Sequence, residues 1–171
     1  MAKLLLVIDM QNDFIDGALG TPEAVKIIPA VEERVKKRQN EGWDVWFTMD
    51  THTEDKYMGS KEGQWLPVPH CIKGSDGWQL RECLRPYADT IIEKPNFGSI
   101  NVAFKASAKG YDEVEIVGLC TDICVISNAM IIKAALPESD IAVVKDCCAG
   151  VTPESHENAL KAMEKCHIKI V

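Results

Sequence analysis

Short apolar runs alternate with helical patterns along the whole chain. Apolar, β-branched stretches predict strands at 4–8, 45–47, 90–92, 114–117, 141–144 and 168–171. Apolar residues at helical spacing predict helices at 21–42, 100–109, 123–136 and 152–166. Only the segment 50–78 lacks sustained periodicity, and a loop of that length in a compact domain is uncommon and usually functional.

Strands that alternate with helices predict an α/β fold. We expect a three-layer, doubly wound, mostly parallel sheet of about six strands with helices on both faces. No linker, repeat or change of composition divides the 171 residues, so we expect a single domain over residues 1–171.

Composition narrows the choice of partners and compartment. Lys and Arg number 19 against 26 Asp and Glu, a formal charge of −7, which argues against nucleic acid or an anionic membrane surface as a partner. No apolar run is long enough to cross a bilayer, and no secretory leader precedes Leu4. Seven cysteines, an odd number, favour mostly free thiols. We therefore expect a cytoplasmic protein.

Polar residues gather at one predicted edge of the sheet. In doubly wound sheets, ligands bind at the carboxyl ends of the strands. The polar residues that follow the predicted strands are Asp9, Asp50 with His52, Lys94, the Cys120–Cys124 turn and Asp146. An acid, a possible chelating pair, a lysine and cysteines are thus predicted on a single rim.

Cys124 is the candidate nucleophile on this rim. A buried cysteine is more often simply a small apolar residue. In the first turn of a helix, however, the dipole favours the thiolate and free backbone N–H groups can hold an oxyanion. With Asp9 to move the proton and Lys94 as the cation, the set suits a cysteine hydrolase. His156 is the alternative base, and we rank it below Asp9 because it lies well after its strand.

A second candidate group contains Asp50, His52 and His70. Asp-x-His after a strand places both side chains on one face of an extended segment, where they could chelate a metal. Two histidines and a carboxylate with open positions suit zinc, iron or manganese. From the residues alone, a metal site and an unmetallated loop remain equally open.

Motifs along essentially the whole chain resemble those of the isochorismatase-like cysteine hydrolase family, with nicotinamidases the most similar members. They are Val7–Phe14, Asp50-Thr51-His52 with Pro69-His70-Cys71, Lys94, Gly118–Val125 and Asp146–Thr152. The resemblance implies a triad of Asp9, Lys94 and Cys124, attack of the thiol on a carboxamide and a thioester intermediate. It also implies an oxyanion hole from the backbone N–H groups of Cys120 and Cys124, and a cis Leu119–Cys120 peptide.

The resemblance further implies a divalent metal and two aromatic residues that sandwich the substrate ring. Phe14 matches one aromatic position, and Trp65 is the candidate for the other. Many nicotinamidases carry another histidine between the positions of His52 and His70, and this chain has none there. Glu54 and Asp55 lie too close to His52 to fold back, so Glu62 is the expected fourth ligand. Family members are commonly homo-oligomers.

Several functions remain candidates. The leading hypothesis is a single isochorismatase-like hydrolase domain that converts nicotinamide to nicotinate and ammonia. Within the family, the alternative is another small amide, such as a ureido or carbamoyl compound. A non-catalytic ligand-binding domain has no need of Asp9, Lys94 and Cys124 together. A thiol redox protein is disfavoured because the chain lacks a Cys-x-x-Cys motif.

Overall fold

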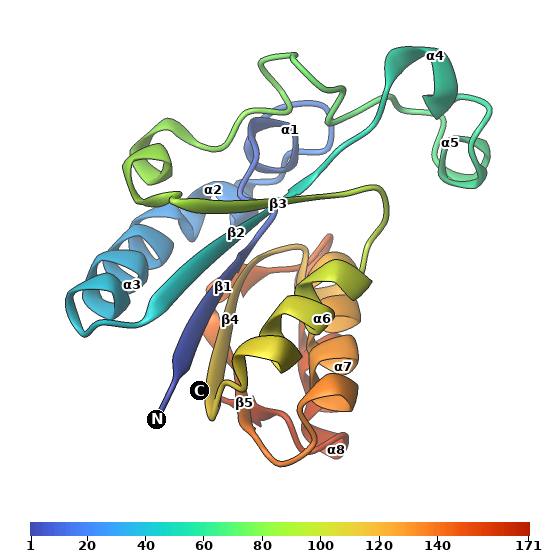
Figure 1. Cartoon of the computed structure of the whole chain (residues 1–171). Coiled ribbons are helices and arrows are strands. Elements are labelled where there is room, and N and C mark those ends of the chain that lie inside the picture. The colour runs from blue at the N-terminus through green and yellow to red at the C-terminus, as the bar shows by residue number, and fades with distance from the viewer.

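A six-stranded, entirely parallel sheet forms the centre of the protein in a computed structural model that describes all 171 residues (Figure 1). The strand order is β3-β2-β1-β4-β5-β6. Their bounds are β1 (Lys3–Ile8), β2 (Asp44–Asp50), β3 (Thr90–Lys94), β4 (Glu113–Leu119), β5 (Asp140–Ala149) and β6 (Lys169–Ile170). The predicted α/β fold with a doubly wound parallel sheet is confirmed.

Helices cover both faces of this sheet (Figure 1). One face carries α1 (Asn12–Ile15), α2 (Pro22–Lys26) and α3 (Ile28–Asn40); the other carries α6 (Ile100–Lys109), α7 (Ile126–Ala135) and α8 (Pro153–Lys165). Side chains of β1 point alternately to the two faces of the sheet. Because helices cover both faces, β1 is buried on both sides. Leu4 and Leu6 pack in the core with α6, α7 and α8, whereas Leu5 and Val7 pack with α2 and α3.

Two predicted helices are divided. The helix expected over 21–42 is split into α2 and α3 at Ile27. Pro29 lies in the first turn of α3, where its missing N–H costs nothing, whereas in a continuous helix its ring would clash with the preceding turn. The helix expected over 123–136 begins with a π-helical turn, η2 (Thr121–Val125), before α7 continues it.

The aperiodic segment after β2 contains more structure than its sequence pattern predicts. It includes two short helices, α4 (Glu54–Tyr57) and α5 (Lys61–Trp65), and a 3₁₀ helix, η1 (Glu82–Tyr87), precedes β3. A correction concerns Asp146, which we expected after a strand on the rim. It lies inside β5, where the register against β4 shifts, and its side chain is exposed.

The strand order reverses between β1 and β4, so the site is expected where these two strands end. Gly118 of β4 pairs there with Ile8 of β1 and has a φ of +117°. A side chain at position 118 would place its Cβ 2.1 Å from the Ile8 carbonyl oxygen. Glycine is therefore needed for β4 to approach the end of β1. No helix in the structure has the length and apolar character to cross a bilayer.

Candidate active site

Three side chains meet at the carboxyl ends of the central strands. Asp9 directly follows β1, Lys94 is the last residue of β3, and Cys124 lies in η2 after β4. Lys94 Nζ lies 2.6 Å from Asp9 Oδ2 and 3.5 Å from Cys124 Sγ. All three residues are at most 4% exposed. The structure thus brings together the acid, the cation and the thiol that the sequence placed on one rim.

Neighbouring groups fix the acid and the cation. The Thr48 hydroxyl donates to Asp9 Oδ1 at 2.6 Å and accepts from the Asp9 backbone N–H at 3.2 Å. Lys94 Nζ also donates to the Asn96 carbonyl oxygen at 2.9 Å. Asp9 has a φ of +47°, a left-handed conformation that is uncommon for a residue other than glycine. The buried contacts that surround Asp9 stabilise this conformation.

Burial controls the protonation of this cluster. It raises the pKa of the Cys124 thiol well above its ordinary value, and Asp9 raises it further against the opposing effect of Lys94. Burial also raises the pKa of Asp9. Burial alone would lower the pKa of Lys94, but Asp9 and Cys124 raise it above its ordinary value. Desolvation and the Asp9 charge thus oppose the thiolate that the helix dipole favours. A base must take the thiol proton.

Asp9 is positioned to be that base, and His156 is not. Lys94 Nζ contacts both the Asp9 carboxylate and the Cys124 thiol, so the acid and the thiol lie on the same ammonium group. His156 Nδ1 instead forms a 2.7 Å hydrogen bond with the Thr121 hydroxyl. The Leu119–Cys120 peptide beside the thiol is cis, as the family resemblance implies.

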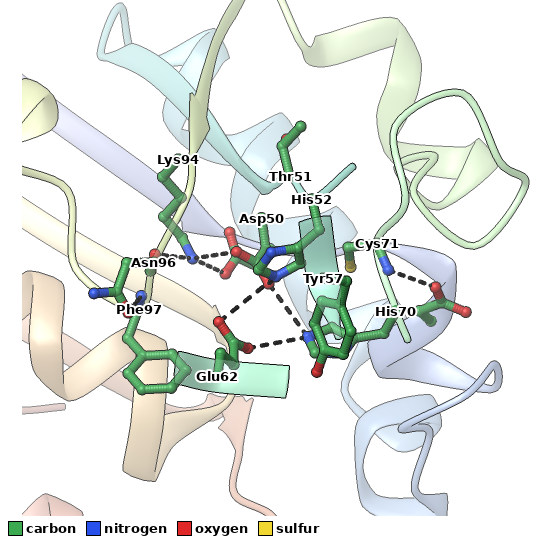
Figure 2. Close-up of polar contacts among 12 residues, drawn as sticks. Asp50, Thr51, His52, Tyr57, Glu62, His70, Cys71, Lys94, Asn96 and Phe97 are labelled. Carbon is green, nitrogen blue, oxygen red and sulfur yellow. Dashed lines mark hydrogen bonds and ion pairs between the residues drawn. The ribbon is translucent and has the colours of Figure 1, made fainter. Parts of the chain in front are cut away.

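Asp50, His52, Glu62 and His70 form a compact cluster beside Lys94 (Figure 2). One potential ligand atom from each residue lies within 4.8 Å of the others. His52 Nε2 is 3.0 Å from Asp50 Oδ2, and His70 Nε2 is 3.3 Å from Glu62 Oε1. The structure therefore brings together the four residues that the sequence and the resemblance suggested, with Glu62 supplied by α5.

Three observations show that this cluster fits a divalent cation. Burial alone would lower the pKa of His70, but Asp50 and Glu62 raise it to about 10, so the cluster favours positive charge. Asp50 Oδ1 is buried without a hydrogen-bond partner. His70 Nδ1 bonds the Val68 carbonyl at 2.9 Å, an arrangement that leaves Nε2 free as a metal ligand once its proton is lost. Two imidazoles and two carboxylates suit zinc, iron or manganese.

Cys124 lines a small inner cavity of about 50 Å³, and a wider hollow of about 620 Å³ adjoins this cavity. Apolar and thiol side chains line most of the inner cavity: Phe14, Leu19, Leu66, Phe97, Cys120, Ile123 and Cys124. Asp50, Glu62 and His70 also line it, so the cavity contacts the thiol and three members of the ligand cluster at once. Leu66, Phe97 and Ile123 also line the outer hollow, so the two spaces share part of their lining.

The structure does not place Trp65 in the inner cavity, contrary to our expectation for a ring-stacking residue. Trp65 is the last residue of α5, is 90% exposed and lines only the outer hollow. Leu66 and Phe97 occupy the inner wall instead. Phe97 was missed because it lies in the loop after β3, and an isolated loop aromatic carries no periodic signal. Phe14 does line the inner cavity and contacts the His70 ring.

Comparison with known proteins defines the class. A model of the isochorismatase domain matches residues 3–171, so the chain belongs to the isochorismatase family of hydrolases. A nicotinamidase of Escherichia coli is 27% identical, over 95% of this chain and 90% of the relative.

Solved structures share the fold. A pyrazinamidase of Pyrococcus horikoshii in complex with zinc is 31% identical, with a TM-score of 0.84 over 100% of this chain and 99% of that one. An N-carbamoylsarcosine amidase from Thermoplasma acidophilum is 28% identical, with a TM-score of 0.79 over 99% and 95% of the two chains. Relatives that act on amides thus have the same fold as this chain.

Proposed function

We propose that the protein hydrolyses nicotinamide to nicotinate and ammonia with a metal-dependent cysteine mechanism. The observation that carries the proposal is the single cavity in which the Cys124 thiol faces the cluster of Asp50, Glu62 and His70. The similarity to a nicotinamidase and to a zinc-containing pyrazinamidase supports an amide on a nitrogen-containing ring.

Asp9 and Cys124 carry out the chemistry in two stages. Asp9 takes the thiol proton as Cys124 Sγ attacks the carboxamide carbon, and backbone N–H groups of Cys120 and Cys124 hold the oxyanion. Asp9 then gives the proton to the leaving nitrogen, which departs as ammonia and leaves a thioester on Cys124. Water attacks the thioester as Asp9 takes one of its protons. The acid product leaves, and the proton returns to sulfur.

Lys94 keeps the charges balanced during these steps. Its ammonium group contacts Asp9 and Cys124, so it stabilises whichever of them is negative. Asp50, His52, Glu62 and His70 would hold the divalent metal. When bound, the metal supplies a Lewis acid that can bind and orient the ring nitrogen of the substrate. Phe14 and Phe97 would contact the ring itself.

Another small amide is the alternative substrate, and the N-carbamoylsarcosine amidase of the same fold is the reason to test it. The charged residues that line the inner cavity favour a neutral substrate, because Asp50 and Glu62 are acidic and no arginine or lysine is among the lining residues. A carbamoyl amino acid carries a carboxylate, and the inner cavity offers it no arginine or lysine, only His70 and the proposed metal.

The test is ammonia release from purified protein loaded with zinc, manganese or iron. Nicotinamide and pyrazinamide are compared with N-carbamoylsarcosine and a simple ureido acid. We expect kcat/KM for nicotinamide to exceed that for the two carboxylate compounds by at least about 100-fold, a difference of about 2.7 kcal/mol. Faster turnover of a carbamoyl compound would reject the proposed substrate, and no turnover of any amide would reject the proposed activity.

A further inference from the structure

The segment between Asp9 and Phe14 contains two polar side chains whose hydrogen bonds the proposed reaction does not use. Gln11, Asn12 and Asp13 belong to the first motif of the chain, but none of them lines the inner cavity. Gln11 is nonetheless fully buried. A buried carboxamide needs hydrogen-bond partners, so its contacts show what it holds in place.

Gln11 holds the backbone of Asp50. Its side-chain oxygen accepts from the Asp50 backbone N–H at 2.8 Å, and its side-chain nitrogen donates to the Asp50 carbonyl oxygen at 2.9 Å. The same nitrogen donates to the Trp78 carbonyl oxygen at 2.8 Å. The pairing of β1 with β2 ends at Val7 and Phe47, three residues before Asp50. Asp50 pairs with Lys94 of β3 on one side, and on the other side the Gln11 side chain takes the place of a β1 partner.

Asp13 holds the backbone next to His70. Its Oδ2 accepts from the Cys71 N–H at 2.8 Å, and its Oδ1 accepts from the Ala18 N–H at 3.2 Å. Cys71 has a φ of +46°, so the chain turns sharply directly after the ligand. A Cβ at Gly77 would lie 2.2 Å from both Asp13 carboxylate oxygens, and the absence of a side chain there makes room for the carboxylate.

We infer that Gln11 and Asp13 are positioning residues of the proposed metal site. One fixes the main chain of Asp50 and the other fixes the main chain beside His70, although 20 residues separate these ligands in the sequence. Backbone hydrogen bonds also pair His52 with Cys71 and Lys73, and in this setting the two side chains help to hold His70 Nε2 3.5 Å from Asp50 Oδ2. Groups that orient metal ligands typically change metal affinity by about 10- to 100-fold when they are removed. The inference rests on the proposed metal-dependent function.

Asn128 provides a matched control in the same protein. It is also a fully buried carboxamide that bridges backbone groups. Its Oδ1 accepts from the Ser99 N–H at 3.0 Å, and its Nδ2 donates to the carbonyl oxygens of Cys124 at 2.8 Å and Phe97 at 3.0 Å. Asn128 thus braces the thiol side of the cavity and has no hydrogen bond to the metal-ligand segments.

The experiment measures metal affinity directly, on the full chain stripped of metal with a chelator. Zn²⁺ dissociation constants are obtained by competition with a chromophoric chelator, and Co²⁺ absorption spectra report ligand geometry. The variants are Gln11→Met, Asp13→Asn and Asn128→Leu, each similar in shape to the residue it replaces. We expect Gln11→Met and Asp13→Asn to weaken Zn²⁺ binding by about 10- to 100-fold and to alter the Co²⁺ spectrum. Asn128→Leu should retain the wild-type affinity and spectrum.

Folded Gln11→Met and Asp13→Asn with wild-type affinity and spectrum would overturn the inference. So would an equal loss of affinity in Asn128→Leu, because the effect would then be one of general stability. If Gln11→Met does not fold, Asp13→Asn decides the matter. A wild-type protein that binds neither metal would overturn the proposed metal site and this inference together. A wild-type protein that binds metal but releases no ammonia would reject only the proposed activity.

Discussion

The thiol side and the metal side of the cavity are built in different ways. On the thiol side, Asp9, Lys94 and Cys124 follow or end strands of the sheet and are almost fully buried. On the metal side, only Asp50 belongs to a strand. His52, Glu62 and His70 come from the long segment between β2 and β3, and Glu62 lies on the five-residue helix α5.

This difference separates two sources of rigidity. Paired strands fix the thiol side, because the backbone hydrogen bonds of a sheet set the positions where the strands end. On the metal side, a single backbone bridge pairs His52 with Ile72 outside the sheet, and side-chain clamps and the cation that the ligands would share add to it. The Gln11 and Asp13 contacts are such clamps. The sheet therefore positions the reactive side chains on the thiol side, whereas side-chain hydrogen bonds help to position the ligands on the metal side.

The largest expected effect lies on the thiol side. Cys124→Ala removes the nucleophile, and we expect ammonia release from nicotinamide to fall by roughly four orders of magnitude or more. Metal content should not change, because Cys124 does not belong to the ligand cluster. Metal analysis and an ammonia assay on the same sample test both points. Cys166→Ala, at an exposed thiol, is the control and should keep full activity. Metal lost together with activity would show that the two sides are not independent.

A smaller effect is expected from removal of one metal ligand. Glu62→Ala should weaken Zn²⁺ binding by about 10- to 100-fold while the protein keeps its melting temperature, because α5 is short and lies outside the sheet. Activity should return when excess metal is added. Competition with a chelator measures the affinity, and Glu54→Ala, at an exposed acid on α4, should behave as wild type. Unchanged affinity in Glu62→Ala would leave a three-residue site of Asp50, His52 and His70.

The smallest effect should distinguish the two aromatic candidates for ring contact. Phe97→Ala removes an inner-wall ring, and we expect KM for nicotinamide to rise by about 2- to 10-fold with little change in kcat. Trp65→Ala should change KM by less than about two-fold, because this exposed side chain lines only the outer hollow. Steady-state kinetics on both variants tests the assignment. The reverse order would return Trp65 to the role that the sequence suggested.

The sequence predicted the thiol side better than the metal side, because the thiol-side residues lie at or after strand ends and most metal-side residues lie on irregular backbone. Strand ends can be located from apolar runs, and parallel strands bring their ends to one edge, so Asp9, Lys94 and Cys124 could be placed together in advance. Asp146 shows the limit of this argument: β5 extends to Ala149, five residues beyond the predicted end at Val144, and carries Asp146 within it.

Residues on irregular backbone could not be placed from periodicity. Whether Trp65 or Leu66 faces the cavity depends on one residue of rotation at the end of α5. The clamps formed by Gln11 and Asp13 connect segments that are distant in sequence and carry no pattern of their own. Resemblance to a family suggested Glu62 as a ligand, and the three-dimensional structure was needed to bring it next to His70.

The strand order has a consequence for how the protein acquires its site during folding. Each parallel pairing joins strands that are separated by a crossover connection, and β1 pairs with β4 across more than 100 residues of chain. Contacts of such long range make folding slow, because a large loop must close before any of them forms. During synthesis, Asp9 leaves the ribosome long before Cys124, so no N-terminal intermediate that ends before η2 contains the complete cluster.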